Sequence, residues 1–370
     1  MRFPSHRLHL TLGLVAVLIA LAVFAPLTQS PHAYAGQGVA LPNPASDNAV
    51  TAGASLHNPN FDNHIWYYFN ERYSYGSLTP YSYMPDDDAA GGPQDWRIWY
   101  LDGSIPILTW ASQEQEATST DRAIKSRTYW GSDYRAGVYQ VIQNTTPCLT
   151  YQFQMHGKFK PGDSGVLHTL KVGIDRDGYY PSDVAVHGFP STTAWGASHP
   201  EYSDYYGSLD VTAEAWGDTI TVFTYADADG GEVLWDTGDF QEVTTDLLSD
   251  PDNPPSPNGI NITSVVTTNT TAQINWWTTN SALGQVYYRL LPSGGTPSTL
   301  PNKIYLPLIA RAGSSWQATT LNKTPVTSHS VTISGLEPGR AYEYIVASRG
   351  LSGGQCETWV SAKEEFTTAP

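Results

Sequence analysis

The stretch from Ser328 to Val346 constrains the fold of this chain more than any other. Its sequence, SHSVTISGLEPGRAYEYIV, alternates apolar and polar residues on both sides of a Leu-x-Pro-Gly segment, and Tyr342 follows Gly339 by three positions. Alternation with a period of two is the pattern of a strand with one buried face, and Pro-Gly marks a turn. The stretch therefore predicts two β-strands joined at a tight corner.

This pattern resembles the corner between strands E and F of a fibronectin type III domain. In that family the leucine, here Leu336, fills the sandwich, and the hydroxyl of the tyrosine, here Tyr342, hydrogen-bonds to nearby backbone. Three more segments resemble strands of the same family, namely Ala272–Trp276 (strand B), Gly284–Tyr288 (strand C) and Glu365–Thr368 (the last strand). The resemblance covers residues 259–369 and implies a spacer or binding module, not a catalyst.

An insertion at residues 291–327 departs from the fibronectin pattern. It contains the apolar run Ile304–Ile309, which Pro307 interrupts. Proline cannot donate a ladder hydrogen bond, so we expect an edge strand or an extended segment. We expect it to pack along its own sandwich, and docking onto the preceding part of the chain is the alternative.

The N-terminus predicts secretion. Arg2 and Arg7 precede an apolar run at residues 8–27, and Ala33-Tyr34-Ala35 supplies small residues at a cleavage site. These are the parts of a secretory signal peptide, here residues 1–35. A retained membrane anchor is the alternative, because the run is nearly long enough to span a bilayer. After cleavage we expect a secreted, extracellular or cell-surface protein with no membrane segment, beginning with a flexible leader at residues 36–53.

Net charge and cysteine content narrow the kinds of partner and of covalent link that we expect for this protein. The chain has 35 Asp and Glu against 19 Lys and Arg, a formal net charge of −16. Phosphate backbones attract the opposite charge, so nucleic acid is excluded as a partner. The only two cysteines, Cys148 and Cys356, fall in different predicted domains. A disulfide is possible in a secreted protein, and two unpaired thiols are the alternative.

Residues 54–246 predict a second all-β unit. Strand-like runs alternate with turns rich in Gly, Asp and Pro, which suits a β-sandwich. These runs are 138–142, 149–155, 167–174 and 220–225. Residues 247–258 contain four prolines and predict an extended linker between the two units.

Four motifs in this unit resemble jelly-roll carbohydrate-binding modules of the galactose-binding-like class. They are Asn60-Phe61-Asp62, GVYQ at 137–140, VGIDRDG at 172–178 and VLWD at 233–236. The resemblance implies a jelly-roll fold and a polysaccharide or cell-surface glycan as ligand. It also implies a structural Ca²⁺ held by Asp62 and Asp236.

Aromatic residues are the candidate ligand contacts, because sugar rings pack their C–H faces on aromatic planes. We select six that fall in or beside expected loops: Tyr179, Tyr180, Trp195, Trp96, Trp99 and Tyr134. Filling of the sandwich core is the alternative for each ring. Asp175 and Asp177 lie in an Asp-Arg-Asp-Gly turn, which could hold calcium or simply end a strand.

We find no motif for a catalytic centre. The ten histidines form no zinc-binding pattern, and no carboxylate lies in a recognisable hydrolase motif. The sequence therefore predicts an all-β, secreted, non-catalytic protein in which a jelly-roll β-sandwich binds a glycan and a fibronectin type III (Ig-like) β-sandwich acts as spacer. A self-associating structural surface protein is the alternative, and a diverged glycoside hydrolase is a weaker one.

Overall fold

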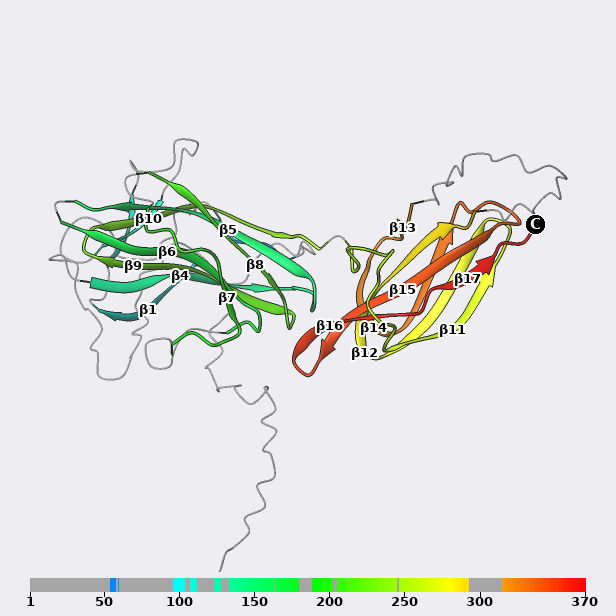
Figure 1. Ribbon diagram of the computed structural model, residues 1–370. Helices are drawn as coiled ribbons and strands as arrows, with labels where there is room; N and C mark the ends of the chain where they lie inside the picture. Colours follow the sequence, from blue (N-terminus) through cyan, green and yellow to red (C-terminus); the bar gives the residue numbers. More distant parts are fainter. Residues whose placement is uncertain are drawn as a thin grey trace, which may run out of the picture. The chain divides into compact units, whose positions relative to one another are not determined.

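A computed structural model of the chain shows strands as its regular elements (Figure 1). The described residues lie within one compact unit, Val50–Pro370. The structure describes residues 54–57, 59, 96–103, 107–111, 123–127, 133–162, 164–179, 188–201, 205–244, 246–292 and 315–370. The predicted signal peptide, the leader, Asp62, Tyr180 and the run Ile304–Ile309 lie outside these residues. Within them, no helix could span a membrane.

Ten strands build the first sandwich. They are β1 (Arg97–Gly103), β2 (Ile107–Ala111), β3 (Ala123–Arg127), β4 (Asp133–Gln143), β5 (Thr150–Lys160), β6 (Val166–Asp175), β7 (Thr193–Trp195), β8 (Gly207–Glu214), β9 (Thr219–Asp229) and β10 (Glu232–Glu242). One sheet has the order β1-β4-β9-β6-β7, and the other has the order β2-β3-β10-β5-β8. The four expected strands at 138–142, 149–155, 167–174 and 220–225 fall in β4, β5, β6 and β9, so these predictions are confirmed.

The pairing of strands identifies a jelly roll. From β3 onward the chain forms four nested antiparallel pairs, β3 with β10, β4 with β9, β5 with β8 and β6 with β7. Such nesting is a long hairpin rolled up so that alternate pairs enter opposite sheets, which is the double-sheet jelly roll. Strands β1 and β2 extend the two sheets beside β4 and β3. The predicted fold of this unit is confirmed.

The core of the jelly roll follows from period-two alternation. Along β5 every second side chain is buried, including Phe153, Met155 and Phe159. Strand β9 contributes Val222 from the other sheet, and Trp235 of β10 is also buried. Because successive side chains point to opposite faces of a strand, the alternate residues of β9 lie on the outer face of the first sheet.

Seven strands build the second sandwich. They are β11 (Ile260–Thr267), β12 (Thr271–Leu290), β13 (Gln317–Ala318), β14 (Asn322–Ser334), β15 (Ala341–Ser352), β16 (Gln355–Val360) and β17 (Glu364–Thr367). The first half of β12 pairs with β11 and β14, and its second half pairs with β15. Strand β12 therefore belongs to both layers, an Ig-like arrangement. The expected strands B and C are its two halves.

The predicted corner is present in this sandwich. Leu336 is buried, and the backbone N–H of Glu337 donates to the Tyr342 hydroxyl over 2.8 Å. Trp276 of β12 is 1% exposed, and its Nε1 donates to Ser348 Oγ over 2.9 Å. The predicted burial of Leu336, the hydrogen bond of the Tyr342 hydroxyl and the core position of Trp276 are thus confirmed.

The segment between β10 and β11 corrects one expectation. Leu247 and Leu248, which the sequence placed in an extended linker, are both buried. Their backbone N–H groups donate to Gln285 Oε1 and to the Tyr287 hydroxyl, over 2.9 and 2.7 Å. The start of the predicted linker is therefore packed and hydrogen-bonded, because its two leucines supply apolar surface that the prolines after them do not.

The two cysteines form a disulfide, Cys148–Cys356. Cys148 precedes β5, and Cys356 lies in β16. The bond thus links the two sandwiches covalently, as one of the two alternatives from the sequence anticipated.

Candidate functional site

A group of aromatic side chains lies on the outer face of the sheet β1-β4-β9-β6-β7. We call it the aromatic face, and it consists of Trp99, Tyr139, Tyr179, Phe189, Trp195, Phe223 and Tyr225. It is separate from the apolar core between the two sheets. Trp99, Tyr139 and Phe223 are fully buried, whereas Tyr179, Phe189, Trp195 and Tyr225 are partly exposed. The second set is the part of the face that a ligand could reach.

Glycines in the sheet make room for the two indoles. Gly173 pairs with Trp195 across β6 and β7, and a Cβ at Gly173 would lie 2.6 Å from Trp195 Cε3. Likewise, a Cβ at Gly137 would lie 2.8 Å from Trp99 Nε1 and would collide with the carbonyl of Thr224. Only a residue without a side chain lets the rings lie this close to the backbone. The sheet is therefore shaped to hold Trp195 and Trp99.

Phe189 holds the rings together. Its ring meets Trp99 and Trp195 edge-on, with centroids 4.8 Å apart in both cases, and meets Phe223 edge-on at 5.1 Å. Edge-to-face contacts at these distances are favourable because the positive edge of one ring meets the negative face of the other. Phe189 thus fixes the orientation of Trp195.

Asp175 fixes the two segments that flank the aromatic face. Its side chain is fully buried at the end of β6. Oδ1 accepts hydrogen bonds from the backbone N–H groups of Asp177 and Tyr179, over 3.1 and 2.9 Å. Oδ2 accepts from the hydroxyls of Thr192 and Thr193, over 2.7 and 3.0 Å. One carboxylate therefore positions both Tyr179 and the residues before Trp195.

Lys171 places a cation among the partly exposed rings. Its Nζ lies 4.5 Å from the ring centroids of both Trp195 and Tyr225, within the range of cation–π attraction. Burial lowers the pKa of Lys171, and the negative charge of Asp227 offsets part of that shift. The ammonium group is thus partly removed from water but remains beside a carboxylate.

Polar groups continue beside Lys171. Asp227 pairs with Thr169 across β9 and β6, and the Thr169 and Ser198 hydroxyls are 2.9 Å apart. Aromatic planes bordered by an amine, a carboxylate and hydroxyls form the mixed surface on which polyol ligands are held. We call Trp195, Tyr225, Lys171, Asp227 and Thr169 the candidate strip.

The structure brings together two of the six predicted ligand contacts. Tyr179 and Trp195 both belong to the aromatic face and both are partly exposed. Tyr180 lies outside the described residues.

The other three predicted contacts are wrong, because these side chains are buried. Trp96 and Tyr134 lie in the apolar core, with 3% and 1% exposure, and Trp96 packs near Phe153. Trp99 belongs to the aromatic face but is 0% exposed, and its Nε1 donates to the carbonyl of Thr224. All three residues fall within or next to strands and not in open loops, so their rings pack in the interior.

The calcium predictions have different outcomes. The carboxylate of Asp175 accepts the four hydrogen bonds described above, so its oxygens hold neighbouring segments in place. One of the four donors is the backbone N–H of Asp177. Asp236 is buried and accepts from the N–H of Thr237 over 2.8 Å. Asp62, its suggested partner, lies outside the described residues, within which no three acidic, His or Cys side chains form a metal-binding group. Calcium at Asp62 and Asp236 stays a prediction.

The sequence reading missed Tyr225, Lys171 and Phe189. Phe223 and Tyr225 alternate with Val222 in the expected strand at 220–225, which is a signal that both rings share a face. Both faces of β9 carry large apolar residues, however, so alternation alone did not tell which one packs in the core. Phe189 and Lys171 carried no signal of their own.

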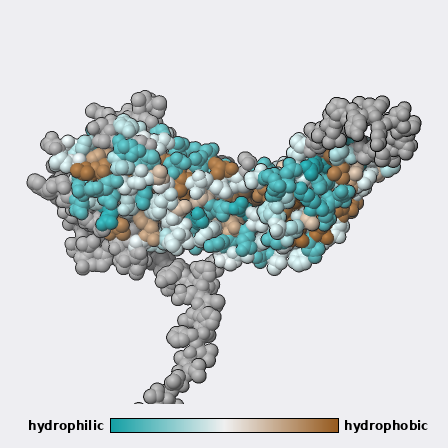
Figure 2. Space-filling view, in the orientation of Figure 1, coloured by the Kyte–Doolittle hydropathy of each residue, from teal (hydrophilic) through white to brown (hydrophobic). Residues whose placement is uncertain are grey.

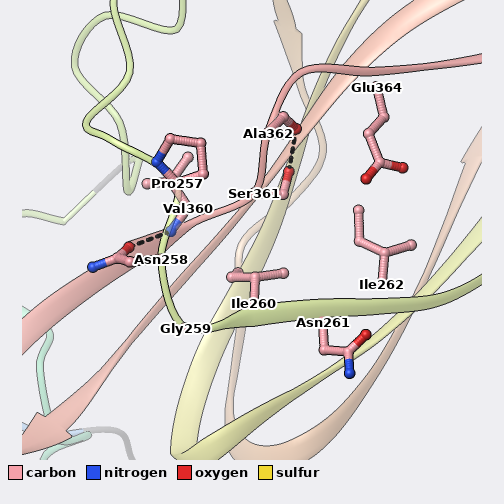
Figure 3. Close-up of a pocket in the computed structure, with 10 residues that line it drawn as sticks. All are labelled: Pro257, Asn258, Gly259, Ile260, Asn261, Ile262, Val360, Ser361, Ala362 and Glu364. Atoms are coloured by element: carbon pink, nitrogen blue, oxygen red, sulfur yellow. Dashed lines mark hydrogen bonds between the residues drawn. The ribbon is translucent and has the colours of Figure 1, made fainter.

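The second sandwich has a groove of about 410 Å³ between β11 and residues 360–364 (Figure 3). Ile260 and Ile262 point into it, toward Ser361 and Glu364. The polar groups near it make internal bonds, since Val360 N donates to Asn258 Oδ1 and Ser361 Oγ donates to the Ala362 carbonyl. We regard this groove as the open edge of the sandwich, not as the candidate site.

A comparison with family models matches residues 257–368 to the purple acid phosphatase N-terminal domain. The match covers the second sandwich and less than half of the chain. The sandwich is therefore similar to that domain, and its assignment to the fibronectin type III family stays a prediction. A comparison with curated proteins found no match.

Solved structures show distant similarity. The tandem CBM22 domains of Paenibacillus barcinonensis Xyn10C share 11% identity over 87% of this chain and 100% of that one, with a TM-score of 0.31. TmCBM61 in complex with β-1,4-galactotriose shares 9% identity over 52% and 100%, with a TM-score of 0.30. The active domain of bacteriophage CBA120 tailspike protein 4 shares 10% identity over 40% of this chain, with a TM-score of 0.31. The match spans only 20% of that tailspike chain. The jelly-roll assignment accordingly rests on the strand pairing of this chain, and the family match concerns its C-terminal sandwich alone.

Proposed function

We propose that the jelly-roll sandwich binds a polysaccharide or cell-surface glycan along the candidate strip. The observation that carries this proposal is the placing of Lys171 between two partly exposed aromatic rings, 4.5 Å from each centroid, with Asp227 alongside. Trp195 and Tyr225 offer apolar planes to the C–H faces of a sugar. Lys171 can donate to sugar hydroxyls, and Asp227 can accept from them.

The ligand class follows from charge. The strip pairs one cation with one carboxylate, in a chain of net charge −16. An anionic polymer would be repelled by the chain as a whole. Uncharged sugars avoid this repulsion and gain most of their affinity from stacking and hydrogen bonds. We therefore propose a neutral glycan.

We also propose that the protein binds its glycan without cleaving it. Asp175, the fully buried carboxylate at this face, is occupied by four hydrogen bonds to loop groups and is not positioned as an acid or base. Together with the predicted signal peptide, this favours a secreted adhesion or retention protein. The C-terminal sandwich, joined through Cys148–Cys356, would act as a spacer with a fixed attachment.

Self-association is the alternative, and it needs a large apolar surface. Figure 2 shows hydrophobic residues scattered in small groups among hydrophilic ones on the visible face. The large hydrophobic side chains that are well exposed in the described residues are Val166, Tyr205, Val243, Val266 and Trp277. Three of them belong to the jelly roll and two to the second sandwich, so the five do not form one apolar face, which favours glycan binding over assembly.

A glycan array probed with purified residues 36–370 tests the proposal. We expect selective binding to neutral polysaccharide fragments and none to polyuronates. Parallel arrays in calcium and in EDTA test the Asp62 and Asp236 prediction, since chelation would weaken binding only if an ion supports the site. An array without any bound glycan, from protein that is folded by circular dichroism, would refute the proposed function.

A further inference from the structure

The outer face of β11, β12 and β14 carries no charged side chain at nine adjoining positions. We call it the neutral face. Its residues form three rows across the strands: Asn261, Trp277 and Ser328; Ser264, Asn275 and Ser330; and Val266, Gln273 and Thr332. Figure 3 shows the side chain of Asn261 pointing away from those of Ile260 and Ile262, which point toward Ser361 and Glu364.

This lack of charge distinguishes the neutral face from the other layer of the same sandwich. The other layer of the same sandwich carries the pair Arg289 and Glu343 across β12 and β15, with an N–O distance of 2.7 Å. The two layers thus differ in the kind of partner that each can accept.

Trp277 lies in the first row of the neutral face. Its neighbour in sequence, Trp276, is buried in the core, whereas Trp277 is 45% exposed on the opposite side of the strand. A large indole left in water is an established feature of binding surfaces, since its burial by a partner is favourable. Trp277 is therefore the natural anchor of this face.

Four polar side chains of the second and third rows are hydrogen-bonded to one another across the strands. Gln273 Nε2 donates to Ser330 Oγ over 2.8 Å, and Asn275 Nδ2 donates to Ser264 Oγ over 2.9 Å. These two bonds use amide N–H groups as donors and hydroxyl oxygens as acceptors, so they do not use the amide oxygens or the hydroxyl protons. Side chains ordered in advance lose little conformational freedom when a ligand binds.

We infer that the neutral face is a second carbohydrate-binding surface, which takes an uncharged glycan chain across the three strands. Trp277 would stack on one sugar ring, while the amide oxygens and hydroxyls of the neighbouring rows bind sugar hydroxyls. Uncharged amides and hydroxyls match an uncharged polyol. A second copy of the protein fits less well, because only Trp277 and Val266 among the nine side chains are large and apolar. This inference does not depend on the candidate strip of the jelly roll.

Affinity electrophoresis of the full mature chain tests this inference. The probes are soluble xylan, β-glucan, galactan and glucomannan, with polygalacturonate as the charged control. Wild type is compared with Trp277→Ala, Trp277→Phe, Trp195→Ala and the double variant Trp277→Ala/Trp195→Ala. Val166→Ala is the control, because Val166 is similarly exposed, at 51%, but lies in the jelly roll.

In the Trp195→Ala background, where the candidate strip is impaired, we expect Trp277→Ala to weaken retardation by a neutral polysaccharide at least about tenfold. Trp277→Phe should retain part of the binding, and Val166→Ala all of it. Binding that remains in Trp195→Ala but disappears in the double variant would assign the two surfaces separately.

Equal retardation of Trp195→Ala and the double variant on every neutral polysaccharide would overturn the inference. A concentration-dependent dimer in light scattering that Trp277→Ala abolishes, without any change in glycan binding, would assign the face to self-association instead. Thermal unfolding of each variant establishes that it is folded.

Discussion

The imidazole of His329 lies parallel to the indole of Trp276, with ring centroids 4.7 Å apart and an interplanar angle of 4°. His329 is 2% exposed, and its Nε2 lies 3.4 Å from the Thr278 hydroxyl. Gly284 makes this stack possible, since a Cβ there would lie 2.7 Å from Trp276 and 2.8 Å from His329. A histidine is thus held in the core of the second sandwich.

This stack predicts that stability falls in mild acid. Burial lowers the pKa of His329 from 6.5 to about 4. Between these values the unfolded chain binds a proton that the folded chain does not, so stability is fully present above pH 6.5 and is lost as the pH falls toward 4. The loss is at most about 3 kcal/mol. Urea unfolding of wild type and His329→Phe at several pH values measures it.

The variant His329→Phe should lose this component of the pH dependence. His168→Gln is the control, because His168 is an exposed histidine of the jelly roll. Equal pH dependence in wild type and His329→Phe would contradict the assignment.

The close packing of Trp195 on Gly173 predicts the effect of adding one methyl group at position 173. In Gly173→Ala the new Cβ would lie 2.6 Å from the indole, so Trp195 must move outward. We expect glycan affinity to fall about tenfold and the free energy of unfolding to drop by about 1–3 kcal/mol. Tryptophan fluorescence should shift to longer wavelength as the ring meets water. The control Gly217→Ala adds the same group where its nearest neighbours are 3.9 Å away, and a similar loss there would show that the effect is not specific to Trp195.

The anchoring role of Asp175 predicts a difference between two substitutions. Asp175→Ala leaves the N–H groups of Asp177 and Tyr179 without their acceptor, which should cost about 3 kcal/mol. Asp175→Asn retains an oxygen for both N–H groups and should cost less. Urea unfolding in calcium and in EDTA measures both, and we expect the same difference in each buffer. A difference that appears only in calcium would reassign Asp175 as an ion ligand.

The disulfide predicts a loss of stability on reduction. Cys148 and Cys356 are 208 residues apart in sequence, so their bond restricts a long loop of the unfolded chain. We expect Cys148→Ala to lower the free energy of unfolding by about 2–4 kcal/mol. The double variant Cys148→Ala/Cys356→Ala should be no less stable than either single variant. Wild-type protein in reducing agent should behave in the same way, and an unchanged urea midpoint there would contradict a structural role.

The strands were predictable where one face of the segment is polar. The corner around Leu336 and Tyr342 combines alternation with specific turn residues, and its resemblance to the fibronectin type III corner predicts the tyrosine hydrogen bond. Strand β5 alternates cleanly and was found for the same reason. The burial of Leu247 and Leu248 was not predictable, because the prolines that follow them dominate the local sequence pattern.

The candidate site was only partly predictable. The first sheet is apolar on both faces, so period two cannot tell the rings of the core from those of the aromatic face. The sequence predicts Tyr134 and Trp99 as ligand contacts because both fall in or beside expected loops, but both are buried. The position of Lys171 between Trp195 and Tyr225 depends on the pairing of β6 with β7 and β9, which joins residues far apart in sequence.

The dissociation constant of Trp195→Ala tests the central claim most directly. It should be measured by calorimetry, beside wild type, for the neutral glycan that binds best on the array. The account predicts an affinity at least about tenfold weaker for the variant, with a jelly roll that is still folded by near-ultraviolet circular dichroism. An unchanged dissociation constant would contradict the claim that the aromatic face of the jelly roll is where the glycan binds.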